Sequence, residues 1–252
     1  MKEYKGYLID LDGTMYRGTE SIKEAGPFVE ELLKRDIPHL FVTNNSSKTA
    51  KQVVEKLTSM GIPAEPSRVF TSSMAASKYV DDTTPDATIY MIGEEGLKEA
   101  LGSRCTLDAS EANVVVMGID RDITYEKLSD AALAVRRGAT FISTNGDKAI
   151  PTEKGFVPGN GSLTSVISVS TGVDPIFVGK PEAIIMEQAL EILGTKRDQT
   201  VMVGDNYDTD IMAGIKARID TIHVATGVTS QEDLKTKTTQ PTHTIPTLKE
   251  WF

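Results

Sequence analysis

The sequence predicts an α/β protein with a doubly wound parallel sheet, a Rossmann-like core, into which a smaller α/β cap domain is inserted. Short apolar runs of β-forming residues alternate with segments of helical periodicity, which is typical of parallel sheets. A charge-rich segment with a proline, residues 81–86, interrupts this alternation and indicates a connection between domains, although a surface loop has a similar composition. We therefore expect a core domain of residues 1–82 and 175–252 and a cap domain of residues 83–174.

The first apolar run, residues 6–9, ends at Asp10 and Asp12. Its uncharged β-forming residues indicate a strand that is covered on both faces. Two carboxylates one residue apart repel each other unless they are protonated, solvated or neutralised by a cation such as Mg²⁺, which prefers oxygen ligands. We favour the cation, and an ordinary Asp-Gly turn is the alternative.

The other elements are expected from the same periodicities. Core strands are expected at residues 38–43, 68–71, 175–178, 200–203, 220–224 and 241–245. Core helices are expected at residues 24–35, after Ser47, up to Val80, and between Pro181 and Gly194. In the cap, strands are expected at residues 87–92, 113–119 and 139–143, and helices at residues 94–101, 124–137 and 162–172.

Polar side chains follow four of the expected core strands. They are Asp10 with Asp12, Thr43, Lys180, and Asp205 with Asp210. Because ligands bind at the carboxyl ends of the strands in open α/β sheets, one parallel sheet would gather these residues along one edge. Each of them alone has an ordinary interpretation as a turn, cap or helix-start residue, but together they predict a functional site.

The composition narrows the class of partner. With 252 residues, 39% of them hydrophobic, the chain has enough material for a large buried core. A net charge of -9 without a basic block argues against nucleic acid and anionic membrane surfaces and favours small ligands, and it leaves a homo-oligomer open. Apolar segments are too short for a membrane span and the N-terminus has no signal-type region, so we expect a cytoplasmic protein. The single cysteine and three histidines argue against a disulfide or a thiolate zinc site.

The ordered motifs resemble those of the haloacid dehalogenase superfamily. They are Asp10-Leu11-Asp12-Gly13-Thr14, Thr43-Asn44-Asn45, Gly179-Lys180-Pro181, and Gly204-Asp205 with Thr209-Asp210. The inserted α/β unit between the second and third motifs is similar to the type IIA cap of NagD-like phosphatases. The resemblance implies a Mg²⁺-dependent phosphomonoesterase that acts on small phosphorylated metabolites, such as sugar-acid phosphates or nucleotides, through an aspartyl-phosphate.

The resemblance also implies a role for each residue. Asp10 would be the nucleophile and Asp12 the general acid and base. The metal ligands would be the Asp10 carboxylate, the Asp12 backbone carbonyl and the Asp205 carboxylate. The phosphate would be bound by Thr43, Asn44 and Lys180, and Asn206 and Asp210 would support the metal site from behind its ligands.

Substrate selection is expected to depend on the cap, because the phosphate-handling residues are generic. The candidates are Asn45 and Ser46 after the second motif, and Asp147 and Lys148 in the loop of residues 145–151. Asp147 is supported by the family resemblance, and Lys148 offers a charge to a second anionic group. The segment Gly159-Asn160-Gly161 resembles a phosphate cradle, but we expect it to be structural.

Two other functions use similar residues. A phosphomutase or phosphotransferase would share the aspartyl-phosphate and differ in passing the phosphoryl group to an acceptor other than water. A phospho-accepting signalling module would also use an Asp, a Thr and a Lys, but it gives no role to Asp12 or to the insertion.

Overall fold

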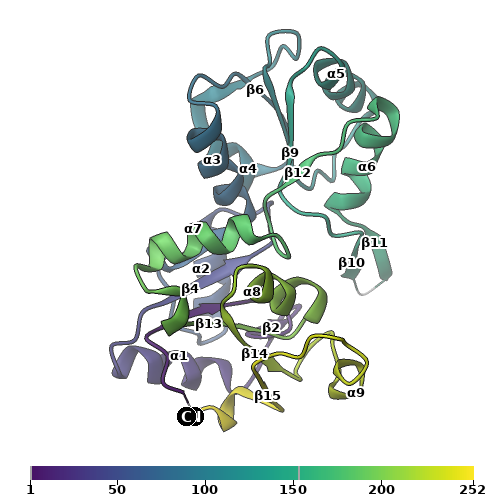
Figure 1. Ribbon diagram of the computed structural model, residues 1–252. Coiled ribbons are helices and arrows are strands. Elements are labelled where there is room, and N and C mark those ends of the chain that lie inside the picture. The colour runs from purple at the N-terminus through teal and green to yellow at the C-terminus, as the bar shows by residue number, and fades with distance from the viewer. Residues whose placement is uncertain (1, 153) are drawn as a thin grey trace. The chain divides into compact units, whose positions relative to one another are not determined.

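The computed structural model describes residues 2–152 and 154–252 and divides the chain into two compact units (Figure 1). Unit 1 runs through Thr43 and includes residues 50–70 and 180–252, and unit 2 includes residues 44–49 and 71–179. The prediction put residues 44–49, 71–82 and 175–179 with the core, whereas they group with unit 2. Each unit contains its own parallel sheet.

The sheet of unit 1 has six strands in the order β15-β14-β13-β1-β4-β5. Their bounds are β1 Gly6–Ile9, β4 His39–Thr43, β5 Val69–Thr71, β13 Thr200–Gly204, β14 Asp220–Val224 and β15 His243–Ile245. Read from β5 to β15 this is the 3-2-1-4-5-6 order of the Rossmann fold, in which the chain direction across the sheet reverses between β1 and β13. The predicted Rossmann-like α/β class is therefore confirmed.

Helices cover both faces of this sheet. They are α1 Ala25–Lys34, α2 Ala50–Ser59, α7 Ala183–Leu193, α8 Met212–Lys216 and α9 Gln231–Leu234, with short 3₁₀ turns at Pro66–Arg68, Arg197–Gln199 and Leu248–Glu250. Alternate strand residues such as Ile9, Phe41 and Val203 share one core with Leu32 of α1 and Leu57 of α2. The helices α7 and α8 pack against each other and against β4 and β14 respectively (Figure 1).

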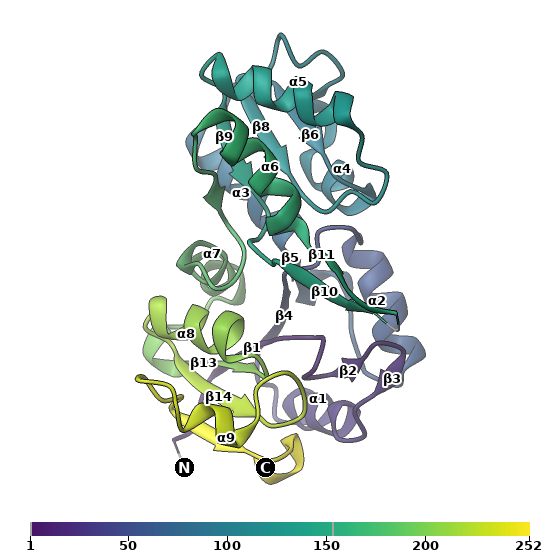
Figure 2. The same cartoon turned by 90° about the vertical axis from the view of Figure 1, so that its right-hand side faces the viewer.

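The sheet of unit 2 has five strands in the order β12-β9-β8-β6-β7, and all of its pairings are parallel. The strands are β6 Ile89–Ile92, β7 Cys105–Thr106, β8 Val114–Met117, β9 Thr140–Ser143 and β12 Ile176–Phe177. The helices are α3 Ser72–Thr83, α4 Glu95–Leu101, α5 Tyr125–Arg136 and α6 Asn160–Thr171. The pair α3 and α4 covers one face and the pair α5 and α6 the other (Figure 2).

The structure corrects the prediction for residues 175–178. The strand in this segment, β12, pairs with β9 at Ile176↔Ile142 and therefore belongs to the sheet of unit 2, not to the core sheet. Its apolar run cannot tell which sheet it joins, because both sheets are parallel and buried. Lys180, a residue of unit 1, therefore comes in the sequence shortly after β12, a strand of the unit 2 sheet.

Two hairpins were also missed by the prediction. The strands β10 (Ala149–Thr152) and β11 (Gly155–Pro158) pair antiparallel, and β2 (Tyr16–Arg17) pairs with β3 (Glu20–Ser21). Most of their residues are exposed, so they lack the apolar run that marks the other strands.

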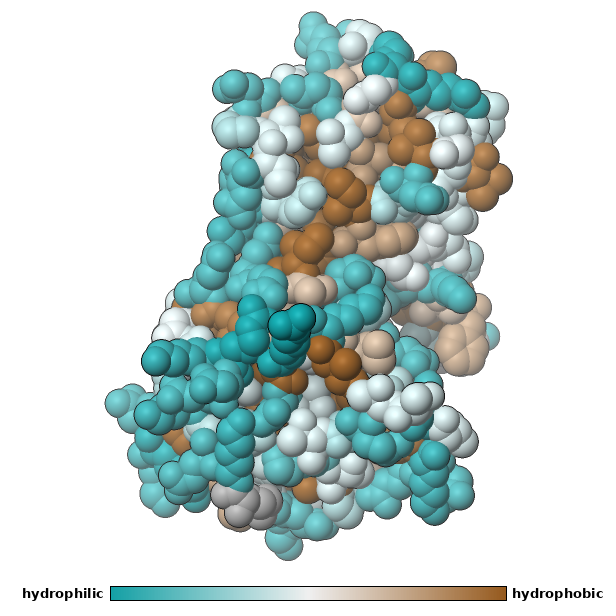
Figure 3. Space-filling model, in the orientation of Figure 1, coloured by the Kyte–Doolittle hydropathy of each residue, from teal (hydrophilic) through white to brown (hydrophobic). Residues whose placement is uncertain are grey.

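The surface of the described residues is mixed in polarity. On the face shown in Figure 3, hydrophilic residues predominate and hydrophobic residues form separate patches. Within residues 2–152 and 154–252, no helix combines the length and the apolar character that crossing a membrane requires.

Candidate active site

Asp10 lies directly after β1, and every residue of that strand is buried. Its backbone N–H donates to the carbonyl of Val203 in β13 at 2.9 Å, so the ladder between the two strands continues up to Asp10. The Asp10 side chain is almost fully buried at this end of the sheet. The carboxylate is therefore placed by one of the two central strands of the sheet.

Asp205 lies directly after β13, which pairs with β1 at Ile9↔Val203. The two carboxylates thus occupy the carboxyl ends of the two strands between which the sheet order reverses, which is where open α/β sheets bind ligands. Asp205 is fully buried, and its two oxygens accept hydrogen bonds from the Thr14 hydroxyl at 3.1 Å and the Val228 N–H at 2.6 Å.

Gly13 allows this approach. Its φ of 92° lies in the left-handed region, and a Cβ at this position would stand 2.3 Å from an Asp205 carboxylate oxygen. Any side chain would therefore meet both backbone strain and a clash with Asp205. The glycine of the Asp-x-Asp-Gly-Thr segment is explained by the proximity of Asp205.

Lys180 connects the acidic residues of the site. Its ammonium donates to Asp10 Oδ1 at 2.5 Å, to Asp210 Oδ1 at 2.8 Å and to the Val42 carbonyl at 2.9 Å. The side chain is 2% exposed, which is rare for a lysine and requires paired charges. The two ion pairs join Lys180 to residues that lie 170 and 30 positions away in the sequence.

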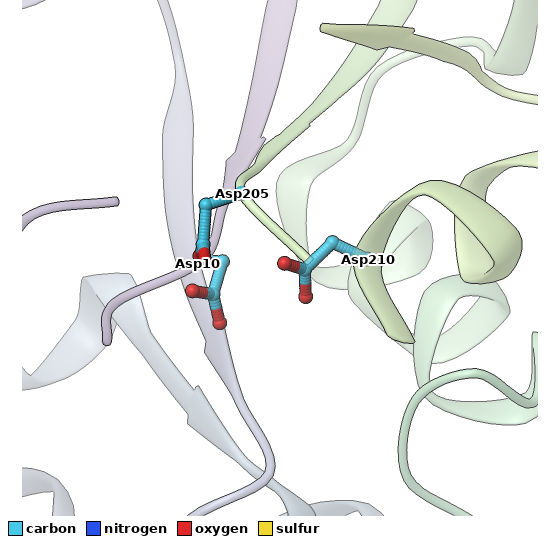
Figure 4. A group of neighbouring side chains, drawn as sticks. All are labelled: Asp10, Asp205 and Asp210. Atoms are coloured by element: carbon cyan, nitrogen blue, oxygen red, sulfur yellow. The ribbon is translucent and has the colours of Figure 1, made fainter. Parts of the chain in front are cut away.

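Asp210 is held by a π-helical turn, Tyr207–Ile211. The Asn206 side chain caps this turn by accepting from the Asp208 N–H at 3.0 Å, and the Asn206 N–H donates to Asp210 Oδ2 at 3.0 Å. Figure 4 shows the side chains of Asp10, Asp205 and Asp210 converging on one point. One carboxylate oxygen from each lies within 4.8 Å of the others.

The charges of this cluster are not balanced by protein groups alone. Burial, and then the negative charge of Asp210, raise the pKa of Asp10 well above its usual range. Burial and Asp210 likewise raise the pKa of Asp205 to about 7. Burial alone would lower the pKa of Lys180, but its two carboxylate partners outweigh burial and raise it. One ammonium among three buried carboxylates is the charge pattern that a divalent cation with oxygen ligands would complete.

Asp12 lies outside this carboxylate cluster. The residue as a whole is exposed, and its backbone forms an isolated β-bridge with Tyr16. Desolvation of the carboxyl group raises the pKa of Asp12, although the positive charge of Lys56 acts in the opposite direction. The Lys56 ammonium stands 3.6 Å from the centre of the Tyr16 ring. A carboxyl group with a raised pKa is suited to donating a proton.

The second motif is divided between the two units. Thr43 ends β4 in unit 1 and is buried, whereas Asn44, Asn45 and Ser46 belong to unit 2. The Asn45 amide oxygen accepts from the Lys48 N–H at 2.9 Å. The buried Ser46 hydroxyl accepts from the N–H of Ile119 at 3.1 Å. The Asn45 side chain therefore fixes the backbone that follows it, and the Ser46 side chain fixes the backbone at Ile119.

The cap candidates lie in the loop between β9 and β10. The Asn44 amide donates to both carboxylate oxygens of Asp147 at 3.3 Å, so the structure brings these two predicted residues together. Lys148 is exposed on the same loop.

Sequence reasoning missed several residues that hold the site. Thr14 and Val228 bind the Asp205 carboxylate, and His223 donates from Nε2 to the backbone carbonyls of Asp205 at 3.1 Å and Thr229 at 3.0 Å. Thr14 lies inside the first motif and could have been found there. Residues 223–229 run from the end of β14 into the loop after it and contain neither an acid nor a glycine-rich motif, so their role could be found only from the tertiary structure.

Comparisons with known proteins agree with this geometry. The family described as haloacid dehalogenase-like hydrolase matches residues 7–104, and a second family, described as HAD-hydrolase-like, matches residues 177–251. The 5'-nucleotidase YutF of Bacillus subtilis is 59% identical over 253 residues, covering 100% of this chain and 99% of that protein. An acid sugar phosphatase of Staphylococcus saprophyticus is 54% identical, covering 99% of this chain and 97% of that protein.

Solved structures give the same result. A thermostable NPPase variant from Geobacillus stearothermophilus has a TM-score of 0.94 at 56% identity, covering 100% of this chain and 99% of that one. A 4-nitrophenylphosphatase from Thermotoga maritima has a TM-score of 0.93 at 32% identity, covering 98% and 96%. The chain therefore belongs to the haloacid dehalogenase-like hydrolases and, among them, to the NagD-like phosphatases, as the motifs predicted.

Proposed function

We propose that the protein is a Mg²⁺-dependent phosphomonoesterase for small phosphorylated metabolites that works through an aspartyl-phosphate on Asp10. The observation that supports this most is the convergence of Asp10, Asp205, Asp210 and Lys180 at the ends of β1 and β13. Relatives named 5'-nucleotidase, acid sugar phosphatase and 4-nitrophenylphosphatase favour hydrolysis over phosphoryl transfer to another acceptor.

In the first step a carboxylate oxygen of Asp10 forms a bond to phosphorus while the bond from phosphorus to the ester oxygen breaks. The leaving oxygen takes its electron pair and receives a proton from Asp12. In the second step water attacks the phosphorus of the aspartyl-phosphate, Asp12 takes a proton from that water, and the Asp10 carboxylate and inorganic phosphate are released. A carboxylate needs no separate base to act as nucleophile, so Asp12 is available for the leaving group.

Mg²⁺ would be held by the Asp10 and Asp205 carboxylates and the Asp12 backbone carbonyl, with Asp210 next to them. When bound, it supplies positive charge that lets an anionic nucleophile and an anionic phosphate come together. Asp210 and Asn206 would support the metal ligands from behind. The Asp210 carboxylate accepts hydrogen bonds from the Lys180 ammonium and the Asn206 backbone N–H, which fix its orientation. Thr43, Asn44 and Lys180 would bind the phosphate oxygens, because hydroxyl, amide and ammonium groups donate hydrogen bonds to them.

Asn45, Ser46, Asp147 and Lys148 are proposed to contribute to the choice of leaving group. Of these, Asp147 offers a carboxylate that accepts hydrogen bonds from hydroxyl groups, and Lys148 offers a charge for a second anionic group. Asn45 and Ser46 would act through the backbone that they organise.

A phosphate-release assay over p-nitrophenyl phosphate, sugar phosphates and nucleoside monophosphates tests the function. The enzyme is expected to release phosphate in the presence of Mg²⁺ and to stop releasing it when EDTA is added. Asp10→Asn is expected to lower kcat by at least about 10³-fold, because the amide cannot act as the nucleophile. Transfer of most of the phosphoryl group to a sugar acceptor instead of water would contradict a phosphatase.

Asp12→Asn is expected to slow turnover by about 10²–10⁴-fold, because an amide neither donates nor accepts the proton. The loss should be smaller for p-nitrophenyl phosphate than for a sugar phosphate, since nitrophenolate leaves without protonation. Rapid-quench measurement of phosphoenzyme and of free phosphate would follow the two steps separately. Equal losses for both substrates would assign Asp12 another role.

A further inference from the structure

The start of α6 holds the loop that carries Asp147, here called the substrate loop, residues 144–148. Three backbone carbonyls of this loop accept hydrogen bonds from residues 159–162. The Gly161 N–H donates to Asp147 O at 2.9 Å, and the Gly159 N–H donates to Lys148 O at 2.9 Å. The side-chain amide of Asn160 donates to Asn145 O at 2.8 Å. The loop is thus bound along its length by one short segment.

Asn160 is the centre of this arrangement. It is 2% exposed, and its amide nitrogen also lies 2.9 Å from the Ser143 hydroxyl and 3.2 Å from the Thr144 hydroxyl. The group that faces Asn145 O must be the NH₂ group, since a carbonyl oxygen only accepts. The three oxygens share the two hydrogens of this NH₂ group, and turning the group away would leave buried acceptors unpaired at the cost of their desolvation.

The two flanking glycines are required by space. A Cβ on Gly159 would stand 2.2 Å from Asp147 O, and a Cβ on Gly161 would stand 2.3 Å from Gly146 O. The φ of Gly159 is -88°, which other residues adopt freely, so its lack of a side chain matters only for the contact with the loop. Both contacts are made with backbone atoms of the substrate loop, which cannot rotate away as a flexible side chain could.

The loop in turn holds the proposed substrate and phosphate residues. The Asn145 amide donates to Asn44 O at 2.9 Å, and its oxygen accepts from the Asp147 N–H at 3.2 Å. The Asp147 carboxylate accepts from the Asn44 amide. A change at Asn160 therefore moves the carboxylate that is proposed to meet the leaving group.

We propose that Asn160, with Gly159 and Gly161, is a positioning residue for substrate selection: it fixes the substrate loop so that Asp147 accepts hydrogen bonds from hydroxyl groups of the leaving group. This inference rests on the proposed function. It assigns selectivity for hydroxyl-rich phosphate esters to a segment that need not touch the substrate.

The test compares kcat/KM for ribose 5-phosphate, which carries hydroxyl groups, with kcat/KM for p-nitrophenyl phosphate, which carries none. Asn160→Ala and Asp147→Ala are each expected to lower the ratio of the two by about tenfold or more, which is the effect of losing one well-placed polar contact. The double variant should show no further fall, because Asn160 acts through Asp147. Ser165→Ala, on the exposed side of the same helix, is the matched control.

Hydrogen exchange of the peptide that covers residues 144–148 supplies a second readout. Faster exchange is expected there in Asn160→Ala and not in Ser165→Ala. If Asn160→Ala does not fold, Gly161→Ala is assessed by the same criteria. An unchanged ratio in the positioning variants, or losses that multiply in the double variant, would overturn the inference. So would an unchanged ratio in Asp147→Ala while the wild type still releases phosphate. No phosphate release by the wild type from any ester would instead refute the proposed function.

Discussion

At the scale of single residues, Asp205 is oriented by donors from distant parts of the chain. Thr14 binds one carboxylate oxygen and the Val228 N–H binds the other, while His223 binds its backbone carbonyl. Groups that orient a metal ligand commonly change metal affinity by about 10–100-fold when they are removed. The Thr14 hydroxyl can be removed with little change in shape.

Thr14→Val is therefore expected to weaken Mg²⁺ binding by about tenfold, since one Asp205 oxygen loses its donor. Calorimetric titration of the enzyme with Mg²⁺ in the absence of substrate measures this directly. The control is Thr19→Val, an exposed threonine of the same segment. Equal Mg²⁺ affinity in Thr14→Val and the wild type would show that Asp205 needs no such support.

His39 gives a prediction about stability and pH. Burial and the nearby positive charge of Arg68 lower the pKa of His39 to about 4 in the folded protein, against 6.5 for an ordinary histidine. The unfolded chain takes up this proton first as the pH falls, so the folded state loses up to roughly 3 kcal/mol between pH 6.5 and pH 4. Above pH 6.5 the contribution is constant.

Urea unfolding at pH 7.5 and pH 4.5 should show a larger loss of stability in the wild type than in His39→Gln, which does not titrate. Comparing the two proteins removes the common contribution of the carboxyl groups. Parallel losses in both would mean that His39 keeps an ordinary pKa in the folded protein.

At the scale of elements, the strand β1 is the support of the site because it lies between β13 and β4 and is buried along its whole length. Leu8 is fully buried, and Leu133 on α5 is 53% exposed. Burial decides the cost of truncating a leucine, since the buried site loses packing and leaves a cavity.

Leu8→Ala is expected to lower the free energy of unfolding by about 2–5 kcal/mol, and Leu133→Ala by less than about 0.5 kcal/mol. Chemical denaturation of the two variants and the wild type measures both values. A loss under about 1 kcal/mol for Leu8→Ala would mean that the strand tolerates a cavity and is less tightly packed than its burial indicates.

The elements also show what the sequence could predict. The runs before Asp10, Thr43 and Asp205 are long, apolar and bounded by turn residues, and each is a strand of the core sheet as expected. The run before Lys180 has the same pattern but forms the edge of the other sheet, because pairing partners are chosen by tertiary contacts that periodicity does not encode. The π-helical turn that presents Asp210 and the exposed hairpin β10–β11 leave no apolar pattern to find.

At the scale of the whole molecule, cation binding and folding are linked, because the clustered carboxylates repel one another in the folded state. Mg²⁺ at 100 times its Kd is expected to stabilise the native protein by about 2.7 kcal/mol, which raises Tm by roughly 5–10 °C for a chain of this size. Thermal unfolding with Mg²⁺ and with EDTA measures the difference.

Asp205→Asn should abolish most of that rise in Tm, and Asp208→Asn should keep it. Asp208 is the matched control, since its exposed carboxylate lies near the site in sequence but pairs with Lys237 at 2.8 Å. The same rise in Tm in both variants would mean that Mg²⁺ stabilises the protein by binding at another site.

The boundaries between the two units bear on any attempt to exchange caps among relatives. The chain crosses between the units after Thr43, after residue 49, after residue 70 and after Gly179. The first and last of these crossings fall at Thr43, Asn44 and Lys180, which are proposed to bind phosphate. A chimaera joined there would inherit its selectivity loop from the donor and its ammonium from the recipient. Grafts that keep residues 44–49 together with residues 71–179 preserve the bonds from Asn44 to the donor's loop, and grafts that divide them do not.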